Sequence, residues 1–267
     1  MSVWKWALLL AASFVLALVM YAAAQTVADA FPVTWVNWLV SIAASAAMLG
    51  LYALFVRWFE GHPVRDIPLR RMAAETGKGF AVGVGFFVVV AGVMAITGLY
   101  HVAELVTDAW MHLLTAFFLF LYVAVGEEIL FRGVLFRWID EKWGFWAALV
   151  VSSLLFGGMH IAQPGATWWS SLAIAIEAGL LLGAAYKWSG TLWFPVGIHW
   201  AWNFLQGNIF GFAVSGGDAG VSLLKAGITG PDILTGGVFG AEASIITVLL
   251  GTALSVWFLL KLKKAKA

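Results

Sequence analysis

The chain alternates between long apolar runs and short polar connections. The apolar runs lie at residues 4–24, 32–56, 79–100, 109–131, 145–161, 168–187, 192–210 and 241–260. Runs of about 20 apolar residues are long enough to cross a lipid bilayer as helices. Only helices and closed barrels satisfy every backbone polar group in lipid, and runs this long and continuous favour helices. We therefore expect an all-α fold, a polytopic membrane bundle of about eight transmembrane helices.

Composition supports a membrane protein. Of the 267 residues, 63% are hydrophobic and only 11% are charged, whereas a soluble domain carries roughly a quarter charged residues. No period repeats and no Ser- or Pro-rich linker divides the chain, so residues 1–267 are interpreted as a single integral membrane domain. The net charge of +1 gives no reason to expect nucleic acid as a partner. The absence of cysteine excludes disulfides, thiol nucleophiles and cysteine-ligated metal.

The basic residues predict an orientation. The run at residues 4–24 is kept as a helix, because its apolar stretch is longer than the core of a usual signal peptide. One side of the bundle receives Lys5, Arg57, Arg65, Arg70, Arg71, Lys78, Arg132, Arg137, Lys142, Lys187 and the tail, and the other side only Lys225. By the positive-inside rule both termini are cytoplasmic. We expect an integral, multi-pass protein of the bacterial cell membrane, with residues 211–240 as a long outside loop.

Ionisable side chains inside the spans mark the candidate chemistry, because such groups are expensive in lipid. They are His112, Glu127, Glu128, Arg132, His160, Glu177 and His199, joined by the amide of Asn203. His112 lies near the outer end of its span and is interpreted as interfacial. Glu177 lies midway along its span beside small residues that allow close packing. Its role, either lining a cavity or bonding to a neighbour, stays open.

The stretch "EEILFR" separates two adjacent carboxylates. Glu128 and Arg132 are four residues apart, so they share a helix face and can pair. Glu127 lies about 100° around the helix and faces a different neighbour. A supporting carboxylate beside a working base is one interpretation. A cluster of interfacial charges at a helix end explains the same residues equally well.

Two further stretches carry polar groups on helix faces. In "FGGMH", His160 lies one turn after Phe156, and the two glycines allow another backbone to approach. A histidine capping a helix end at the interface is the competing interpretation. In "HWAWN", His199 and Asn203 share a face and could both donate to one oxygen, as an oxyanion hole requires. An interhelical hydrogen bond is the alternative there.

The spacing of these groups predicts one shared cavity between the fourth, fifth and seventh spans. Glu127 lies 13 residues before Asp140, and His160 lies 15 residues after Phe145. Both are therefore about 20 Å from the turn of a helical hairpin. His199 lies only about 11 Å inside its own span. That depth agrees only if the fourth helix continues through "FRWIDEKW" or the seventh begins near residues 189–190.

A metal site is a weaker prediction. Two histidines and two glutamates could bind zinc, but the chain has no HExxH motif and no pair of histidines at helical spacing. We therefore expect no cofactor, with zinc as the alternative.

The three stretches, in this order, resemble the CPBP family of intramembrane proteases, which includes the CAAX prenyl proteases and the bacterial Abi-type proteins. The family pattern is EExxxR, FxxxH and HxxxN, and the chain carries all three between residues 127 and 203 without departure. The resemblance implies a peptide-bond hydrolase built on an eight-helix bundle. It implies that Glu127 and His160 activate a water, that His199 and Asn203 stabilise the oxyanion, and that Glu128 and Arg132 support the site.

The resemblance also shapes the remaining expectations. It implies a peptide or membrane-protein substrate inside the lipid bilayer, and it favours a cavity that opens on the cytoplasmic face. It favours a glutamate-based mechanism without metal, although the family was long described as metalloproteases. A membrane transporter or a non-catalytic membrane anchor is the alternative function, because carboxylates and histidines also build proton relays in membranes.

Overall fold

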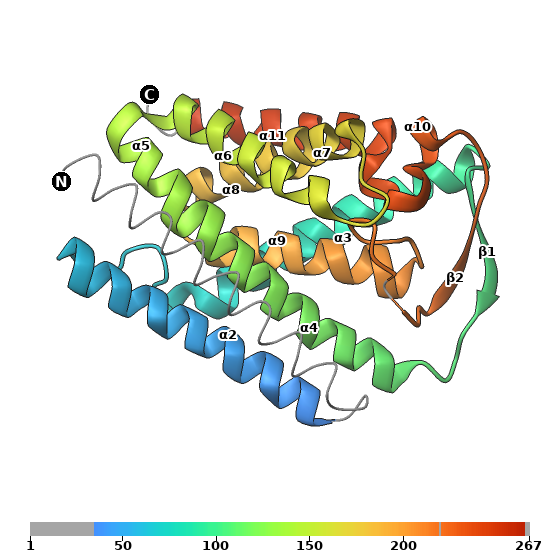
Figure 1. Cartoon of the computed structure of the whole chain (residues 1–267), viewed down its shortest axis with the longest axis horizontal. Coiled ribbons are helices and arrows are strands. Elements are labelled where there is room, and N and C mark those ends of the chain that lie inside the picture. The colour runs from blue at the N-terminus through green and yellow to red at the C-terminus, as the bar shows by residue number, and fades with distance from the viewer. Residues whose placement is uncertain (1–34, 219, 265–267) are drawn as a thin grey trace.

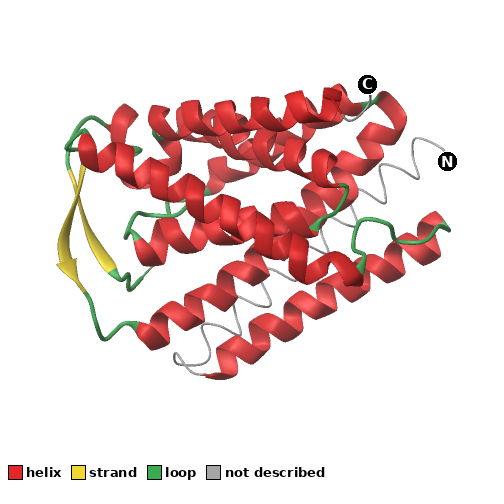
Figure 2. Cartoon of the chain, turned by 180° about the vertical axis from the view of Figure 1, so that it is seen from behind, coloured by secondary structure: helices red, strands yellow, loops and turns green. Residues whose placement is uncertain are grey.

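The computed structural model describes residues 35–218 and 220–264. The predicted span at residues 4–24 lies outside this part. The long helices are α2 (Trp35–Phe55), α3 (Met72–Ile96), α4 (Trp110–Glu128), α6 (Phe145–Met159), α9 (Trp193–Phe204) and α11 (Ile245–Lys264). The shorter helices are α5 (Arg137–Trp143), α7 (Trp168–Ile174), α8 (Leu180–Ser189) and α10 (Asp232–Thr235), and the strands are β1 (Tyr100–Leu105) and β2 (Leu224–Ile228) (Figures 1 and 2).

Six helical segments in the described part are long and apolar enough to cross a membrane. They are Trp35–Glu60, Leu69–Ile96, Trp110–Trp143, Phe145–Ala162, Trp168–Ser189 and Ile245–Leu262. These segments confirm an all-α polytopic bundle and an integral, multi-pass membrane protein. The predicted span at residues 192–210 is helical as well, through α9 and a π-helical turn at Leu205–Ile209. It is shorter than the six and almost entirely buried within the bundle.

Helix α9 is the centre of the bundle. Of its 12 residues 10 are buried, so neighbouring elements cover it on nearly every side. Glycines allow α3 to contact α9 backbone to backbone. A Cβ at Gly79 would lie 2.0 Å from the carbonyl oxygen of Phe194, and one at Gly197 would lie 2.2 Å from that of Thr76. On another face, the indole of Trp200 donates to the carbonyl of Phe117 in α4 over 2.7 Å.

The fourth span is longer than the apolar run that predicts it. Helix α4 continues through a π-helical segment at Ile129–Phe136 into α5, and this continuous run ends at Trp143. The next helix begins directly after Gly144, which has a left-handed φ of 86° and makes the predicted hairpin turn. The extension of the fourth helix is thus the alternative that the structure favours. Helix α9 does not start near residues 189–190, because Gly190 is the left-handed end of α8.

Small residues allow α6 and the sixth span to pack closely against each other. A Cβ at Gly157 in α6 would lie 2.2 Å from the carbonyl of Ser171, and one at Gly179 would lie 2.8 Å from Cα of Ser153. The expectation of close approach is confirmed at Gly157 but is wrong at Gly158, where a Cβ would meet nothing within 4 Å. Close packing along the sixth span places Glu177 in the interior, where its side chain is fully buried.

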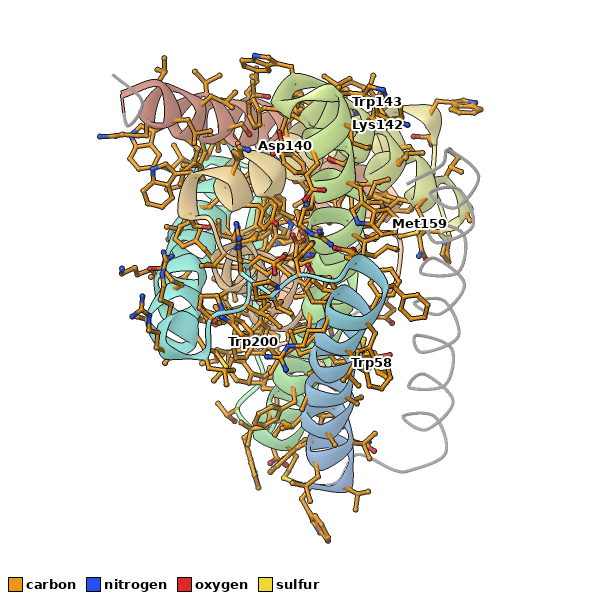
Figure 3. The ribbon with its side chains drawn as sticks, turned by 90° about the vertical axis from the view of Figure 1, so that its left-hand side faces the viewer. Trp58, Asp140, Lys142, Trp143, Met159 and Trp200 are labelled. Atoms are coloured by element: carbon orange, nitrogen blue, oxygen red, sulfur yellow. The ribbon has the colours of Figure 1, made fainter. Side chains whose placement is uncertain are left out.

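One end of the bundle, which we term the basic end, holds α5 and the last turn of α11 (Figure 1). Figure 3 looks onto this end, where Trp58, Asp140, Lys142 and Trp143 lie. The Arg137 guanidinium makes two hydrogen bonds to Glu60 at 2.6 and 2.7 Å, and Lys187 pairs with Asp140. These contacts fix the ends of the second, fourth and sixth spans to one another.

The opposite end, which we term the strand end, carries the antiparallel pair of β1 and β2 (Figure 1). The pair begins with Tyr100 opposite Ile228 and has a bulge between Val102 and Glu104. The predicted third span at residues 79–100 is therefore wrong at its end: α3 stops at Ile96, Gly98 turns the chain at a φ of 75°, and Tyr100 begins a strand. The predicted loop at residues 211–240 contains β2 and α10 rather than irregular chain alone.

The contact between α3 and α9 yields a matched test of packing. Gly79→Leu drives a side chain into the backbone of α9, and overpacking of this kind costs about 1–3 kcal/mol. We expect a lower midpoint of thermal unfolding in detergent. Gly85→Leu is the control on the same helix, because a Cβ there meets nothing within 4 Å. Equal midpoints for the two variants would contradict the close approach of α3 and α9.

Candidate active site

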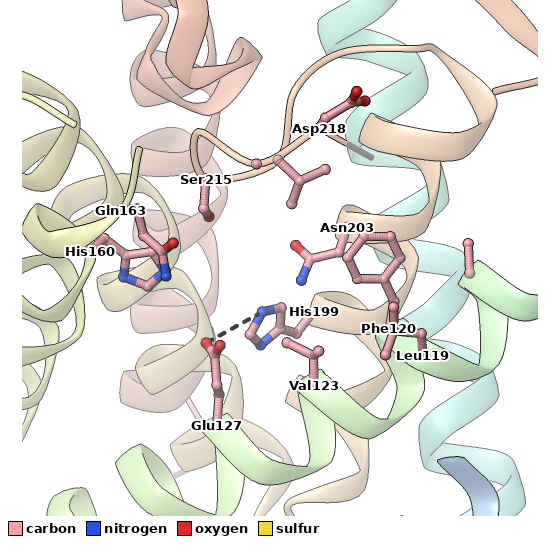
Figure 4. Close-up of a pocket in the computed structure, with 13 residues that line it drawn as sticks. Leu119, Phe120, Val123, Glu127, His160, Gln163, His199, Asn203, Ser215 and Asp218 are labelled. Carbon is pink, nitrogen blue, oxygen red and sulfur yellow. Dashed lines mark ion pairs between the residues drawn. The ribbon is translucent and has the colours of Figure 1, made fainter. Parts of the chain in front are cut away.

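The four residues predicted to be catalytic line one cavity of about 280 Å³. Glu127 comes from α4, His160 from the short 3-10 turn after α6, and His199 and Asn203 from α9. Figure 4 shows His160 and Asn203 on opposite sides of the cavity, with Glu127 and His199 side by side. Leu119, Phe120 and Val123 add an apolar wall from α4. The structure thus joins all three sequence motifs at one place.

A fully buried ion pair lies behind the cavity. Nη1 of Arg132 donates to Oε1 of Glu128 over 2.8 Å, and neither side chain is exposed. Nη2 of Arg132 donates to the carbonyl of Gly179 over 3.2 Å. The guanidinium also lies 4.7 Å from the centre of the Phe156 ring, within reach of a cation–π interaction. Arg132 therefore compensates the charge of Glu128 and joins three helices at the site.

The imidazole of His199 lies between the two adjacent glutamates. Its Nδ1 is 3.0 Å from Oε1 of Glu128, and its Nε2 is 3.8 Å from Oε2 of Glu127. A ring nitrogen that faces an ionised carboxylate carries the hydrogen of that bond, so Nδ1 is protonated. A carboxylate behind a histidine fixes the orientation of the ring. Glu128 consequently supports the site through His199 as well as through Arg132.

Phe156 connects the two histidines. Nδ1 of His160 donates to the carbonyl of Phe156 over 2.7 Å, which leaves Nε2 of the neutral ring free to accept. The ring of Phe156 lies 4.9 Å from the ring of His160 and 6.0 Å, edge-on, from that of His199. The phenylalanine of the FxxxH motif therefore orients its own histidine through the backbone and packs on both imidazoles through the ring.

The loop around Ser215, at the strand end, forms the wall of the cavity that lies at the top of Figure 4 and that we term the upper wall. The sequence analysis did not assign this loop to the site. Val214 and Gly217 exchange two backbone hydrogen bonds around Ser215 and Gly216, both with positive φ, as in a two-residue hairpin turn. The backbone N–H of Ser215 donates to the carboxylate of Glu242. The Ser-Gly dipeptide could have indicated the turn, but nothing local indicates that the turn reaches the site.

Glu242 is a site residue that sequence reasoning missed. It is buried just before the last span, and burial raises the pKa of its carboxyl to about 7, although the bond from Ser215 opposes the shift. The rule that selected the other ionisable residues would have selected it too, since it lies at the start of the predicted span at residues 241–260. Glu242 fixes the upper wall of the cavity rather than lining its main volume.

Glu177 and His112 lie apart from the main cavity. Glu177 and Glu242 both line a smaller inner cavity of about 20 Å³, which also touches His160 and His199. That volume suits roughly one water. Neither carboxylate oxygen of Glu177 has a hydrogen-bond partner among the described residues. His112 is exposed near the start of α4, as expected of an interfacial residue.

Across residues 35–218 and 220–264, no three His, Asp or Glu side chains are grouped so that they could hold a metal ion.

Part of the chain is similar to a known family. Residues 108–205 match the family model of type II CAAX prenyl endopeptidases, Rce1-like. The match confirms the resemblance to the CPBP family. The matched segment contains every residue from Glu127 to Asn203 that the three motifs contribute.

A curated protein is similar to part of the chain. The chain is 37% identical over 82 residues to YpbD of Bacillus subtilis (strain 168), described as an uncharacterized protein. The alignment covers 31% of this chain and 38% of YpbD, so the likeness concerns a part of each protein. No solved structure matches the chain significantly.

The buried ion pair leads to a stability prediction. Arg132→Ala leaves Glu128 buried without its charge partner, and breaking such a pair costs about 3–5 kcal/mol. Asn203→Ala removes one neutral amide, worth about 1 kcal/mol. We expect the Arg132 variant to unfold at a clearly lower temperature in detergent. Glu128→Gln combined with Arg132→Met, which removes both charges, should recover part of the loss. Equal unfolding temperatures for the two alanine variants would refute these roles.

Proposed function

We propose that the chain is an intramembrane endopeptidase of the CAAX type, which hydrolyses a peptide bond with a water activated by glutamate and histidine. One observation carries the proposal: Glu127, His160, His199 and Asn203 line a single cavity inside a membrane bundle. The family match of residues 108–205 supports the same reaction class.

Glu127 acts as the general base. Its Oε2 is buried at the cavity wall and has no hydrogen-bond partner among the described residues, so it is available to accept a proton. A carboxylate within reach of a water supplies base catalysis. The water gives its proton to Glu127 as its oxygen bonds to the scissile carbonyl carbon. Glu127 then returns that proton to the nitrogen that leaves, and the C–N bond breaks.

His160 positions the water. Its Nδ1–H donates to the carbonyl of Phe156, so Nε2 accepts a hydrogen bond from the second O–H of the water. The ring is held by packing on Phe156, which keeps this acceptor in place. A nucleophile fixed in the orientation for attack removes much of the entropic barrier.

His199 and Asn203 stabilise the oxyanion. Because Nδ1–H of His199 is given to Glu128, the ring donates to substrate only when Nε2 carries a second proton. The proposed role therefore requires the doubly protonated ring, which lies between Glu128 and Glu127. The amide of Asn203 supplies the second donor. Each prearranged donor is worth about 3–4 kcal/mol in the transition state.

The role of Glu127 is tested by a near-isosteric substitution. Glu127→Gln should reduce turnover at least about 100-fold, because an amide cannot accept the proton of the water. The protein should still express and fold in detergent. Glu104→Gln is the control, since Glu104 is an exposed glutamate at the strand end whose ion pair with Lys225 is also exposed. Turnover above about a hundredth of the wild-type rate would remove Glu127 from the role of base.

The oxyanion role has its own measurement. Asn203→Ala should lower turnover by roughly 100-fold, as the loss of one oxyanion donor does elsewhere. The substrate KM should change little, because the amide acts on charge that develops during the reaction. A variant that keeps its turnover number but binds substrate poorly would instead make Asn203 a substrate-binding residue.

The reaction is proposed to run without a metal cofactor, and zinc is the alternative. Activity should survive prolonged treatment with a strong chelator, since no ligand set of the usual zinc spacing is present in the sequence. Complete loss with the chelator, restored by zinc alone, would make this a metalloenzyme. A transporter or non-catalytic anchor predicts no turnover in either condition, so the same assay separates all three.

A further inference from the structure

We propose that the cavity opens on the extracytoplasmic side, so that the substrate is a peptide segment that reaches Glu127 from outside the cytoplasm. That a substrate exists rests on the proposed function, whereas the orientation of the cavity is independent of it. Two independent observations carry the inference: where the rim of the cavity lies, and how charge is distributed between the two ends of the bundle.

The rim of the cavity belongs to the strand end. Its exposed lining residues are Gln163, directly after the 3-10 turn of His160, and Asp218, beyond the Ser215–Gly216 turn. These two loops touch, because a Cβ at Gly216 would lie 1.7 Å from the carbonyl of Pro164. Figure 4 shows Asp218 across the cavity from Glu127. A peptide that enters beside Asp218 therefore travels inward to the base.

Toward the basic end, the described residues close the site. Glu128 and Arg132 are fully buried directly behind His199. Farther along the same helix, Phe131, Val134 and Phe136 are buried in the apolar core. The route from the basic end to Glu127 is therefore filled by packed side chains, whereas the route from the strand end is lined by exposed polar residues.

The charges assign the two ends to the two faces of the membrane. The segments at the strand end, residues 97–109, 160–167 and 210–244, contain Lys225 as their one lysine or arginine. They also contain the exposed acids Glu104, Asp108, Asp218 and Asp232. The basic end carries Arg57, Arg65, Arg70, Arg71, Lys78, Arg137, Lys142, Lys187 and Lys261. Since short cytoplasmic loops are enriched in Lys and Arg, the strand end lies outside.

This orientation narrows the class of substrate. A cytoplasmic mouth, which the family resemblance favours, would suit the tail of a cytoplasmic protein. A mouth at the strand end instead suits the extracytoplasmic part of an exported peptide or of a membrane-anchored protein. The wall of Leu119, Phe120 and Val123 on α4 offers an apolar surface to such a segment beside the reactive groups.

The absence of cysteine makes the orientation directly measurable. Asp218→Cys at the rim and Lys225→Cys on β2 report on the strand end. Arg57→Cys and Lys142→Cys are matched controls at exposed positions of the basic end. Intact cells are treated with a membrane-impermeant maleimide, and the same cells are then permeabilised. We expect labelling of the first pair in intact cells and of the second pair only after permeabilisation.

Each labelling outcome decides the inference without reference to activity. Labelling of Arg57→Cys and Lys142→Cys in intact cells, with protection of the other two, would reverse the orientation and overturn it. Labelling of Lys225→Cys without Asp218→Cys would show that the rim is closed to water and would overturn the proposed mouth. If one variant of a pair fails to express, the other reports the same end.

A second measurement concerns the substrate. A library of quenched fluorescent peptides that cannot cross membranes is added to right-side-out and to inside-out vesicles that contain the protein. Cleavage is expected in right-side-out vesicles only, and it should disappear in Glu127→Gln. Cleavage in inside-out vesicles alone would overturn the inference. No cleavage in either preparation, together with outside labelling of Asp218→Cys, would count against the endopeptidase function and leave the orientation standing.

Discussion

The candidate site depends on the buried pair of Glu128 and Arg132. Two charges removed from water are costly unless their remaining hydrogen-bonding capacity is used. Here the guanidinium reaches Glu128, the carbonyl of Gly179 and the face of Phe156, and Glu128 also binds His199. These contacts connect α4 with the helices that carry the other two motifs. The geometry of the reactive groups is thus a consequence of satisfying one buried charge.

The surrounding helices are adapted to that requirement. The segment after Glu128 is π-helical, and a second π-helical turn at Ala175–Gly179 contains the carbonyl that Arg132 binds. Such turns are often found at functional sites, because they release backbone groups from the regular helical ladder. Gly179 also packs directly on Ser153 of α6, which brings this carbonyl near the arginine. Small residues therefore determine whether the ion pair can be satisfied.

Local sequence patterns predicted the helical bundle and the proximity of the motif residues. They did not predict contacts between residues far apart in the sequence. The spacing of Glu128 and Arg132 gave their contact, and the lengths of the hairpin arms gave the shared depth of Glu127 and His160. The burial of α9 was not predictable, because a short apolar helix looks the same at the centre of a bundle as at its surface. The wall around Ser215 escaped prediction too, since it depends on a bond to Glu242, 27 residues away.

The two ends of the bundle differ in structure: the basic end is closed by packed side chains, and the strand end gives access to the cavity. At the basic end, contacts such as that of Arg137 with Glu60 tie helix ends together, and apolar packing lies between them and the ion pair. At the strand end, the two loops that carry Gln163 and Ser215 line the cavity. The attraction between Glu128 and Arg132 stays strong only where bulk water is limited, because a high dielectric weakens it. Closing one side of the site and opening the other gives a peptide access to Glu127 while the charges behind it stay shielded, and this explains why the two adjacent glutamates of one motif have such different surroundings.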